Sequence, residues 1–544
     1  MNLDARETQS SVSPPHSARV SWLPFVLAVA FALTYTQSPL FYSNQNQYLL
    51  HGLKNGGYGH LTSDWLAQTK DPTPLFSALI QISYQLAGLW PIQFVYFGIL
   101  CGYFLLAWSL VKRLGFVDGS TPSLLGFTAL LCLTHAAESR LLSVALTGVD
   151  YPWFLQAGVA GQYALGAGLQ PSCFAVLFFA SLVAYLKGRP VLASFLAAST
   201  SWFHATYLLP AAFLTVGYLA NAVANRKVVL GIVMGLTAFM TALPSVIYVL
   251  VVFRPDDPVL FAESQRILAT IRIPHHSVIA RWFDLVAGLQ LVWIVMGLFT
   301  IRKSILFRPL LTATVLAVLV TIVQWWTSND TLALLFPWRL SVILVPLSTM
   351  IFSALLGRFI PTSISKVSIW FFALTGTFIM TFGLGYRVNK QEWPLLRRIH
   401  EQSKTDDCFL IPTKFPAVGK GHGSMSASFT PPPRSIPGSN LIPSDLQGFR
   451  LATGSPIYID FKSIPYAPRE VLEWEQRMKQ AVKWYAEERW DREETIQELR
   501  NAGITHVVIP AGQVHIYRWG AAVYHDPFFT VYALPPMTSP RIKP

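Results

Sequence analysis

Residues 228–252 read VVLGIVMGLTAFMTALPSVIYVLVV, contain no charged side chain, and directly follow Arg226-Lys227. A helix of this length and composition spans the roughly 30 Å hydrocarbon core of a bilayer. The pattern recurs along the first two thirds of the chain, where apolar runs end at basic pairs such as Lys112-Arg113 and Arg302-Lys303. Basic residues in these places are typical of the cytoplasmic loops of multispanning proteins. The sequence therefore predicts an α-helical polytopic membrane protein.

Composition divides the chain into parts that meet different solvents. Hydrophobic residues make up 52% and charged residues 13%, and 36 of the 69 charged residues lie in the last 158 positions. An ordinary soluble domain has roughly 25% charged residues. We therefore expect a cytoplasmic polar tail at 1–21, a transmembrane domain at 22–386 and a small soluble α/β domain at 387–544.

The net charge of +13 does not indicate nucleic-acid binding, because the basic residues of the transmembrane part stand at the ends of apolar runs. The four cysteines show no CxxC or Cys/His spacing, so we expect neither a disulfide nor a structural zinc.

The apolar runs predict about eleven crossings, with the N-terminus inside and the soluble domain outside. Run 75–89 is expected to lie on the outer face, because a crossing there would place Lys112-Arg113 outside. Runs 190–203 and 205–221 are short for full spans, but the basic clusters that follow favour two crossings over one. The predicted crossings are 22–42, 92–111, 122–137, 169–187, 190–203, 205–221, 228–252, 284–301, 309–326, 333–355 and 366–386.

The acidic residues of the membrane part gather in the predicted outer loops 43–91, 138–168 and 253–283. In the first loop, Asp64 follows a Gly-rich turn and precedes Trp65. Such a carboxylate can take a proton from a hydroxyl nucleophile, which makes Asp64 the candidate catalytic base. A helix-capping Asp beside an interfacial Trp is the alternative, and the spacing leaves both open.

Candidate substrate contacts come from the second and third loops and from one later run. Glu138 and Asp150 lie in the second loop, where a local ion pair between Glu138 and Arg140 is the alternative. In the third loop, Arg272 with His275-His276 suits a phosphate. Adjacent histidines diverge on a helix or strand, so one shared metal is not expected.

Arg339 lies inside an apolar run, in Pro337-Trp-Arg-Leu-Ser341. An unpaired charge is costly there, so the side chain is expected to face a polar cavity or a partner. Snorkelling to the nearer membrane surface is the alternative.

The tail combines short β-type runs at 408–412, 457–461, 506–510 and 528–534 with charged helical runs at 468–488 and 492–502. The long loop 415–445, rich in Gly and Pro, is expected to cover the membrane cavity. Asp460, Lys462 and Tyr466 end a predicted strand, where they either meet an acceptor or pin the strand to the next helix.

The chain resembles the membrane glycosyltransferases of the GT-C superfamily. The resemblance is architectural and covers most of the chain: a first helix, a polar outer loop with an amphipathic helix, further spans with acidic outer loops, a late intramembrane Arg and a soluble outer tail. The motifs NQYLLHGL (46–53), DWL (64–66), PHH (274–276) and PWRLS (337–341) also look like those of a group of bacterial multispanning proteins without an assigned reaction. They identify a group and not a reaction.

The resemblance implies that Asp64 is the base and that Arg339 holds the phosphate of a polyprenyl-phosphate sugar. Many of those enzymes carry acidic residues just after the first helix, whereas this chain has the amides Asn44–Gln47. Either Asp64 has taken the role from later in the loop, or catalysis has been lost.

The expected function is transfer of a sugar from a polyprenyl-phosphate donor to a saccharide, lipid or protein acceptor at the outer face of the bacterial inner membrane, as part of the cell envelope. Asp64 would deprotonate the acceptor, while Arg339, Arg272 and His275 would neutralise the phosphate leaving group; His276 is a further candidate phosphate contact. No cofactor is evident, and a divalent metal stays open. The alternative is a non-catalytic membrane protein, either a transporter or a lipid- or polysaccharide-binding assembly component.

Overall fold

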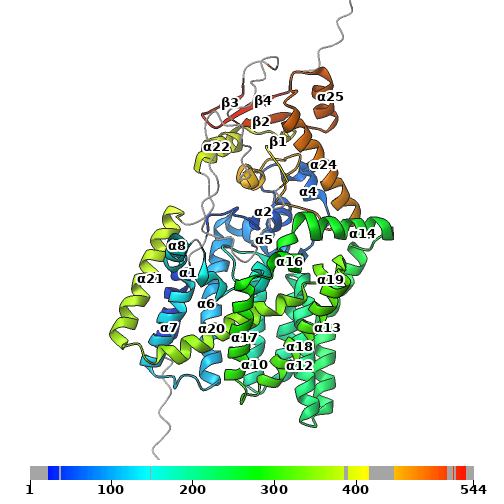
Figure 1. Cartoon of the computed structure of the whole chain (residues 1–544). Coiled ribbons are helices and arrows are strands. Elements are labelled where there is room, and N and C mark those ends of the chain that lie inside the picture. The colour runs from blue at the N-terminus through cyan, green and yellow to red at the C-terminus, as the bar shows by residue number, and fades with distance from the viewer. Residues whose placement is uncertain are drawn as a thin grey trace, which may run out of the picture.

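The computed structural model describes residues 22–35, 38–147, 149–384, 390–415, 446–510, 519 and 522–534. A helical body carries a smaller domain with a sheet at one end (Figure 1). The helices of the body are α1 (Leu23–Tyr35), α2 (Gln45–Tyr48), α3 (Leu50–Asn55), α4 (Trp65–Gln68), α5 (Pro74–Ala87), α6 (Trp90–Arg113), α7 (Thr121–His135), α8 (Ala137–Thr147), α9 (Tyr151–Phe154), α10 (Val176–Leu186), α11 (Pro190–Ser199), α12 (Leu208–Ala224), α13 (Val228–Val252), α14 (Pro258–Arg266), α15 (Pro274–Ser277), α16 (Ile279–Trp282), α17 (Leu285–Thr300), α18 (Phe307–Thr327), α19 (Asp330–Leu334), α20 (Ser341–Gly357) and α21 (Thr362–Phe382).

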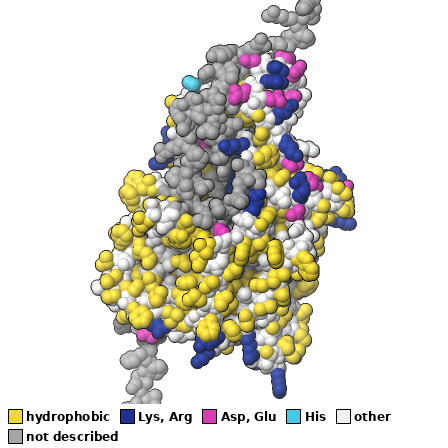
Figure 2. Space-filling view, viewed as in Figure 1, with side chains coloured by type: hydrophobic (Ala, Val, Ile, Leu, Met, Phe, Trp, Pro, Cys, Tyr) yellow, Lys and Arg dark blue, Asp and Glu magenta, His cyan; other side chains and the backbone are white. Residues whose placement is uncertain are grey.

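Six helical segments among the described residues are long and apolar enough to cross a membrane. Only 11% of the apolar stretch of α13 is buried inside the protein, against 83% for segment 330–357, which contains α20. On the face of the body shown in Figure 2, apolar side chains dominate the surface, and Lys and Arg gather at the end away from the sheet domain. Exposed apolar surface costs about 25 cal/mol per Å² in water, so this surface suits lipid. The chain is a membrane protein in which α20 is central and α13 peripheral.

The finer prediction of about eleven crossings is not confirmed as a count. Six predicted runs fall in the long helical segments, α7 and α8 form a pair bent by 49°, and α1, α10 and α17 belong to shorter apolar segments. Segment 190–221 is broken into α11 and α12, because His204 between them has extended backbone. The predicted surface run 75–89 corresponds to α5. The orientation stays a prediction, and residues 1–21 lie outside the described part.

The C-terminal part contains a small sheet with helices beside it. Its helices and strands are α22 (Trp393–Gln402), α23 (Phe449–Thr453), α24 (Pro468–Glu487), α25 (Glu493–Asn501), β1 (Phe409–Leu410), β2 (His506–Pro510), β3 (Tyr524–His525) and β4 (Phe529–Ala533). The strand order is β1-β2-β4-β3, with β1 parallel to β2 and the other pairs antiparallel. Helix α24 buries Val471, Trp474, Met478 and Tyr485 on one face, at the spacing of an amphipathic helix.

One predicted strand of the tail is wrong. In 457–461 only Ile457 makes a β-bridge, to Phe409. The Asp460 carboxylate accepts a hydrogen bond from the Ser463 amide at 2.6 Å, which bends this segment into a loop. Of the loop predicted to cover the cavity, 416–445 lies outside the described residues.

The first loop of the body holds the sheet domain in place. The hydroxyl of Tyr58 donates to the Leu451 carbonyl at 2.8 Å, and the His60 amide donates to the Gly454 carbonyl at 2.7 Å. Gly59 adopts φ +55°, and a Cβ there would lie 2.4 Å from the Gly454 oxygen. The Gly-rich turn therefore permits close approach of two backbones.

Candidate functional site

A cavity of about 420 Å³ lies between the body and the sheet domain. The loop of α2, the loop 161–172, the segments around α15 and α19, and the chain before α24 all contribute to its wall. No Asp or Glu is among the described residues that line it. Its polar lining comprises Asn44, Gln47, Tyr48, Thr73, Gln162, Tyr163, Gln170, Ser172, His204, Thr206, Gln265, Arg272, His275, His276, Arg339, Lys462 and Tyr466.

Arg339 reaches the cavity from a break in a helix. Phe336 adopts φ +50°, and a 3₁₀ turn, η7 (Pro337–Leu340), separates α19 from α20. This left-handed backbone is unusual for an aromatic residue and stops the helix. Irregular backbone at membrane depth occurs where it lines a cavity or is buried in protein. The sequence-based expectation that Arg339 faces a polar cavity is confirmed.

The Arg339 side chain is only 8% exposed. Its Nη1 donates to Thr206 Oγ1, and its guanidinium lies 5.0 Å from the centre of the Tyr207 ring. Within the described part of the chain, no carboxylate lies within ion-pair distance of Arg339, and its Nε has no hydrogen-bond partner. A buried cation with an open donor favours an anion beside it.

Two further cations face the same space. Arg272 ends η6 (Ile267–Arg272), a π-helical segment of a kind that is frequent at functional sites. Burial lowers the pKa of Arg272, but a guanidinium stays charged in proteins. Its Nη2 donates to the backbone carbonyl of Lys462, and the Lys462 side chain lines the cavity from the sheet domain. Three positive side chains from distant segments therefore converge.

His275 and His276 follow Pro274 in α15 and also line the cavity. Their ring centres lie 4.0 Å apart. The charge of its neighbour, together with burial, lowers the pKa of His275, and burial lowers the pKa of His276 to about 4. The lowered pKa values favour the neutral form of both rings at pH 7. They offer hydrogen bonds, whereas the sequence had suggested charged contacts to phosphate.

Asp64, the predicted base, lies outside the cavity lining and is fully buried. Its Oδ1 accepts a hydrogen bond from the Ala67 amide at 3.0 Å, so Asp64 caps α4. Helix capping was the alternative to a catalytic role for this residue. Its Oδ2 accepts Arg450 Nε at 2.8 Å and the Ile457 amide at 3.1 Å. Both oxygens are thus occupied by protein donors.

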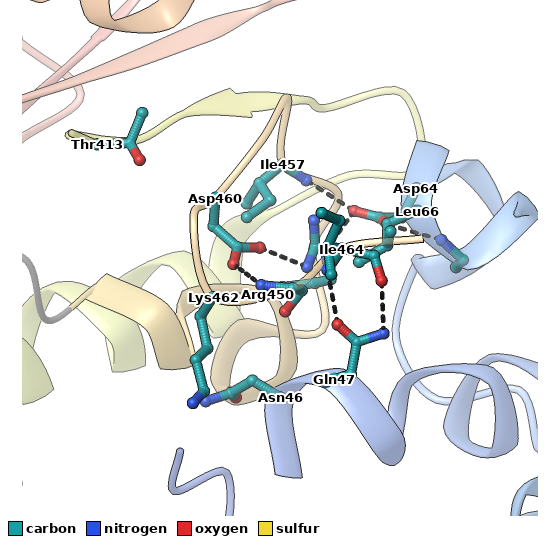
Figure 3. A network of polar contacts seen from close by, with 12 residues as sticks. Asn46, Gln47, Asp64, Leu66, Thr413, Arg450, Ile457, Asp460, Lys462 and Ile464 are labelled. Atoms are coloured by element: carbon teal, nitrogen blue, oxygen red, sulfur yellow. Dashed lines mark hydrogen bonds and ion pairs between the residues drawn. The ribbon is translucent and has the colours of Figure 1, made fainter. Parts of the chain in front are cut away.

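Arg450 joins two carboxylates in the interior. Its Nη1 donates to Asp460 Oδ2 at 2.7 Å, so the guanidinium lies between Asp460 and Asp64 (Figure 3). Beside this ion triad, Gln47 exchanges two hydrogen bonds with the backbone of Ile464, at 3.0 and 2.6 Å. The triad and this amide pair tie the chain before α24 to the first loop.

Asp150 and Glu138, the remaining candidate contacts, also lie outside the cavity lining. Asp150 Oδ2 accepts Arg140 Nη2 at 2.8 Å, and both side chains are buried. Glu138 accepts a hydrogen bond from Thr375 in α21. The local ion pair of Arg140 is therefore made with Asp150 and not with Glu138.

Four of the seven predicted site residues thus meet in one cavity: Arg339, Arg272, His275 and His276. Lys462 and Tyr466 also line it, whereas Asp460 holds Arg450 instead. Sequence reasoning did not single out Arg450, and it noted Gln47 only as one of the amides after the first helix; the two residues lie 403 positions apart. Only the fold brings their segments together. In the described residues, no group of three or more His, Cys, Asp or Glu could hold a metal.

Residues 440–481 match a family model described as a domain of unknown function, DUF6798. No curated protein and no solved structure matches the chain. The matched segment contains Arg450 and Asp460 of the ion triad and Lys462 and Tyr466 of the cavity lining. The family match therefore falls on the part of the tail that completes the cavity.

Proposed function

We propose that this membrane protein binds the phosphate of a lipid-linked sugar in the cavity, at the outer face of the plasma membrane, and transfers the sugar to an acceptor. The observation that carries the proposal is the convergence of Arg272, Arg339 and Lys462 on a space without a described carboxylate. Guanidinium groups form strong charge-assisted hydrogen bonds with phosphate.

A lipid-linked ligand fits because the cavity reaches the periphery of the body. Val249 near the end of α13 and Phe253 just after it are lining residues, together with Leu334 of α19. Helix α13 is also the crossing segment with the smallest buried part. An apolar chain can leave the cavity on this side while the phosphate stays with the arginines.

A sugar fits because the remaining wall is rich in uncharged hydrogen-bonding groups. Gln162, Gln170, Tyr163 and Tyr48 all belong to the lining. Amides and phenols both donate and accept hydrogen bonds, as recognition of hydroxyl groups requires.

A non-catalytic lipid- or polysaccharide-binding protein is the second candidate. The position of Asp64 favours it, because this carboxylate caps α4 and binds Arg450 instead of facing the cavity. The cavity then supplies binding without a carboxylate base.

The experiment is binding and transfer by the full chain in lipid nanodiscs, with farnesyl phosphate and polyprenyl-phosphate sugars as probes. Loss of one hydrogen bond to a charged group costs about 1.5–3 kcal/mol, so Arg339→Met and Arg272→Met should each weaken binding by about 10- to 150-fold. Arg266→Met is the control, because Arg266 pairs with Glu263 on the surface.

Transfer by the wild type, lost in the cavity variants, supports the transferase. Binding without transfer across acceptors supports the second candidate. The absence of any binding by the wild type, or equal binding by Arg339→Met and Arg266→Met, would refute the proposed ligand.

A further inference from the structure

The imidazole of His276 is fixed in one tautomer by a strained turn. Its Nδ1 lies 2.5 Å from the carbonyl oxygen of Ala160. A carbonyl oxygen only accepts, so Nδ1 carries the proton, and Nε2 of the neutral ring has a free lone pair. Among the described residues, Nε2 has no hydrogen-bond partner, and the side chain lines the cavity.

The turn that presents this carbonyl is unusual. Ala160 has φ +59° and Gly161 has φ +62°, so two successive residues are left-handed. The turn is held by the Gly158 amide, which donates to the Gln162 carbonyl at 2.8 Å, and by the Val159 amide, which donates to Ser341 Oγ at 3.0 Å. A left-handed alanine costs free energy, and such strain clusters at functional sites. Here the turn places the Ala160 carbonyl oxygen within hydrogen-bonding distance of His276 Nδ1.

The charged and titratable groups around His276 come from every neighbouring element. His275 shares α15, Arg272 lies on the packed η6, and Arg339 and Lys462 line the same cavity. The other elements packed against α15 carry Arg281 on α16 and Asp330 on α19, outside the cavity lining. A phosphate bound to Arg272 and Arg339 adds negative charge to this set. It therefore favours a proton on Nε2.

We infer that His276 Nε2 is the proton acceptor of the cavity, and the inference rests on the proposed sugar transfer. The acceptor's O–H bond breaks and its proton goes to Nε2, while the oxygen forms a bond to the anomeric carbon. The bond from that carbon to the phosphate oxygen breaks, and the electron pair leaves on the phosphate. Arg272 and Arg339 neutralise that charge.

The first test measures protons and needs no transfer. Calorimetric titration with farnesyl phosphate near pH 5.5, in two buffers of different ionisation enthalpy, gives the protons taken up on binding. His276→Asn keeps an amide donor at the Nδ1 position and removes Nε2. It should take up fewer protons than the wild type. The control His400→Asn should keep the wild-type uptake, because His400 Nδ1 also faces a carbonyl oxygen, that of Thr453 at 3.0 Å, but the residue lies outside the cavity lining. Proton loss by the phosphate itself is common to all three and cancels.

The second test measures transfer. We expect kcat of His276→Asn to fall by about 10²- to 10⁴-fold with little change in KM, and the acidic limb of its pH profile to disappear. A kcat within threefold of the wild type, or unchanged proton uptake, would overturn the inference while leaving donor binding intact. If the wild type does not bind farnesyl phosphate, both the proposed function and this inference are refuted. If the wild type binds farnesyl phosphate but transfers no sugar, the proton uptake on binding tests the role of His276.

Discussion

Replacing Arg450 by Met tests how the sheet domain is held on the body. The Arg450 side chain is 1% exposed and pairs with Asp64 at 2.8 Å and Asp460 at 2.7 Å. Both carboxylates are themselves buried, at 0% and 3% exposure. The methionine keeps the volume and removes the charge. It leaves two carboxylates in the interior with only backbone amides to stabilise them.

Removing one partner of a buried ion pair typically costs about 3–5 kcal/mol. Here one arginine pairs with two carboxylates. We therefore expect the free energy of local opening to fall by about 3–5 kcal/mol at pH 7.5, which is roughly 150- to 5,000-fold in the opening constant.

Hydrogen exchange in nanodiscs, followed on peptides from 449–465, measures this opening. Arg469→Met is the matched control, because Arg469 of α24 also bridges to the body, at 3.5 Å from Asp256, but with both side chains largely exposed. Exposed pairs contribute about 0–1 kcal/mol. The combined change Asp64→Asn, Arg450→Met and Asp460→Asn should recover most of the protection, because it strands no charge.

Equal protection in Arg450→Met and Arg469→Met would refute the assignment of the triad as the anchor. A triple variant no better protected than Arg450→Met would show that packing, and not charge, sets the stability.

Further predictions concern the turn, the second loop and pH. Gly59→Ala should destabilise the docked domain more than Gly57→Ala. Both glycines have positive φ, but only a Cβ at position 59 would clash with another segment, at Gly454. Hydrogen exchange of peptides from 446–460 measures the difference. Asp150→Asn should lower the unfolding temperature, because it removes the carboxylate that pairs with the buried Arg140, yet leave farnesyl phosphate binding unchanged; weakened binding would assign Asp150 to the ligand site. The pKa of His276 is about 4 in the folded chain against 6.5 ordinarily, so the unfolded state binds its proton first. The contribution of His276 to the free energy of unfolding is therefore complete above pH 6.5. It should fall as the pH is lowered toward 4, by up to about 1.4 kcal/mol per pH unit. Thermal unfolding measured across this pH range should show a smaller slope for His276→Asn.

Much of the fold could be predicted because lipid imposes a simple rule on sequence. An apolar run such as 228–252 has few alternatives to a helix, and that helix is α13. The number of crossings was less accessible, because α1, α10 and α17 are shorter than a full span. In the tail, residues 457–461 have the composition of a strand, but the hydrogen bond that the Asp460 carboxylate accepts from the Ser463 amide favours a loop instead.

The candidate site could be predicted where an isolated residue is costly in its local setting. Arg339 in an apolar run required a polar environment, and the structure supplies one. Asp64 shows the limit of this reasoning. A polar loop gives an acid no local preference between facing a ligand and capping a helix, and its partner Arg450 lies 386 residues away. Long-range pairing of this kind leaves no periodicity to detect.

The cavity depends on the ion triad, although Arg450 does not line it. Asp460 is two residues before Lys462, and Arg272 donates to the Lys462 carbonyl, so the loop that Arg450 holds also positions a cation of the site. Arg450→Met should therefore weaken farnesyl phosphate binding by about 10-fold or more, the loss of one charge-assisted contact.

The uncharged triple variant should restore this binding, and Arg469→Met should leave it unchanged. Restored docking with binding still lost would mean that the triad's charges act on the ligand directly. Unchanged binding in Arg450→Met, with the domain shown to open, would mean that the body alone makes the anion site.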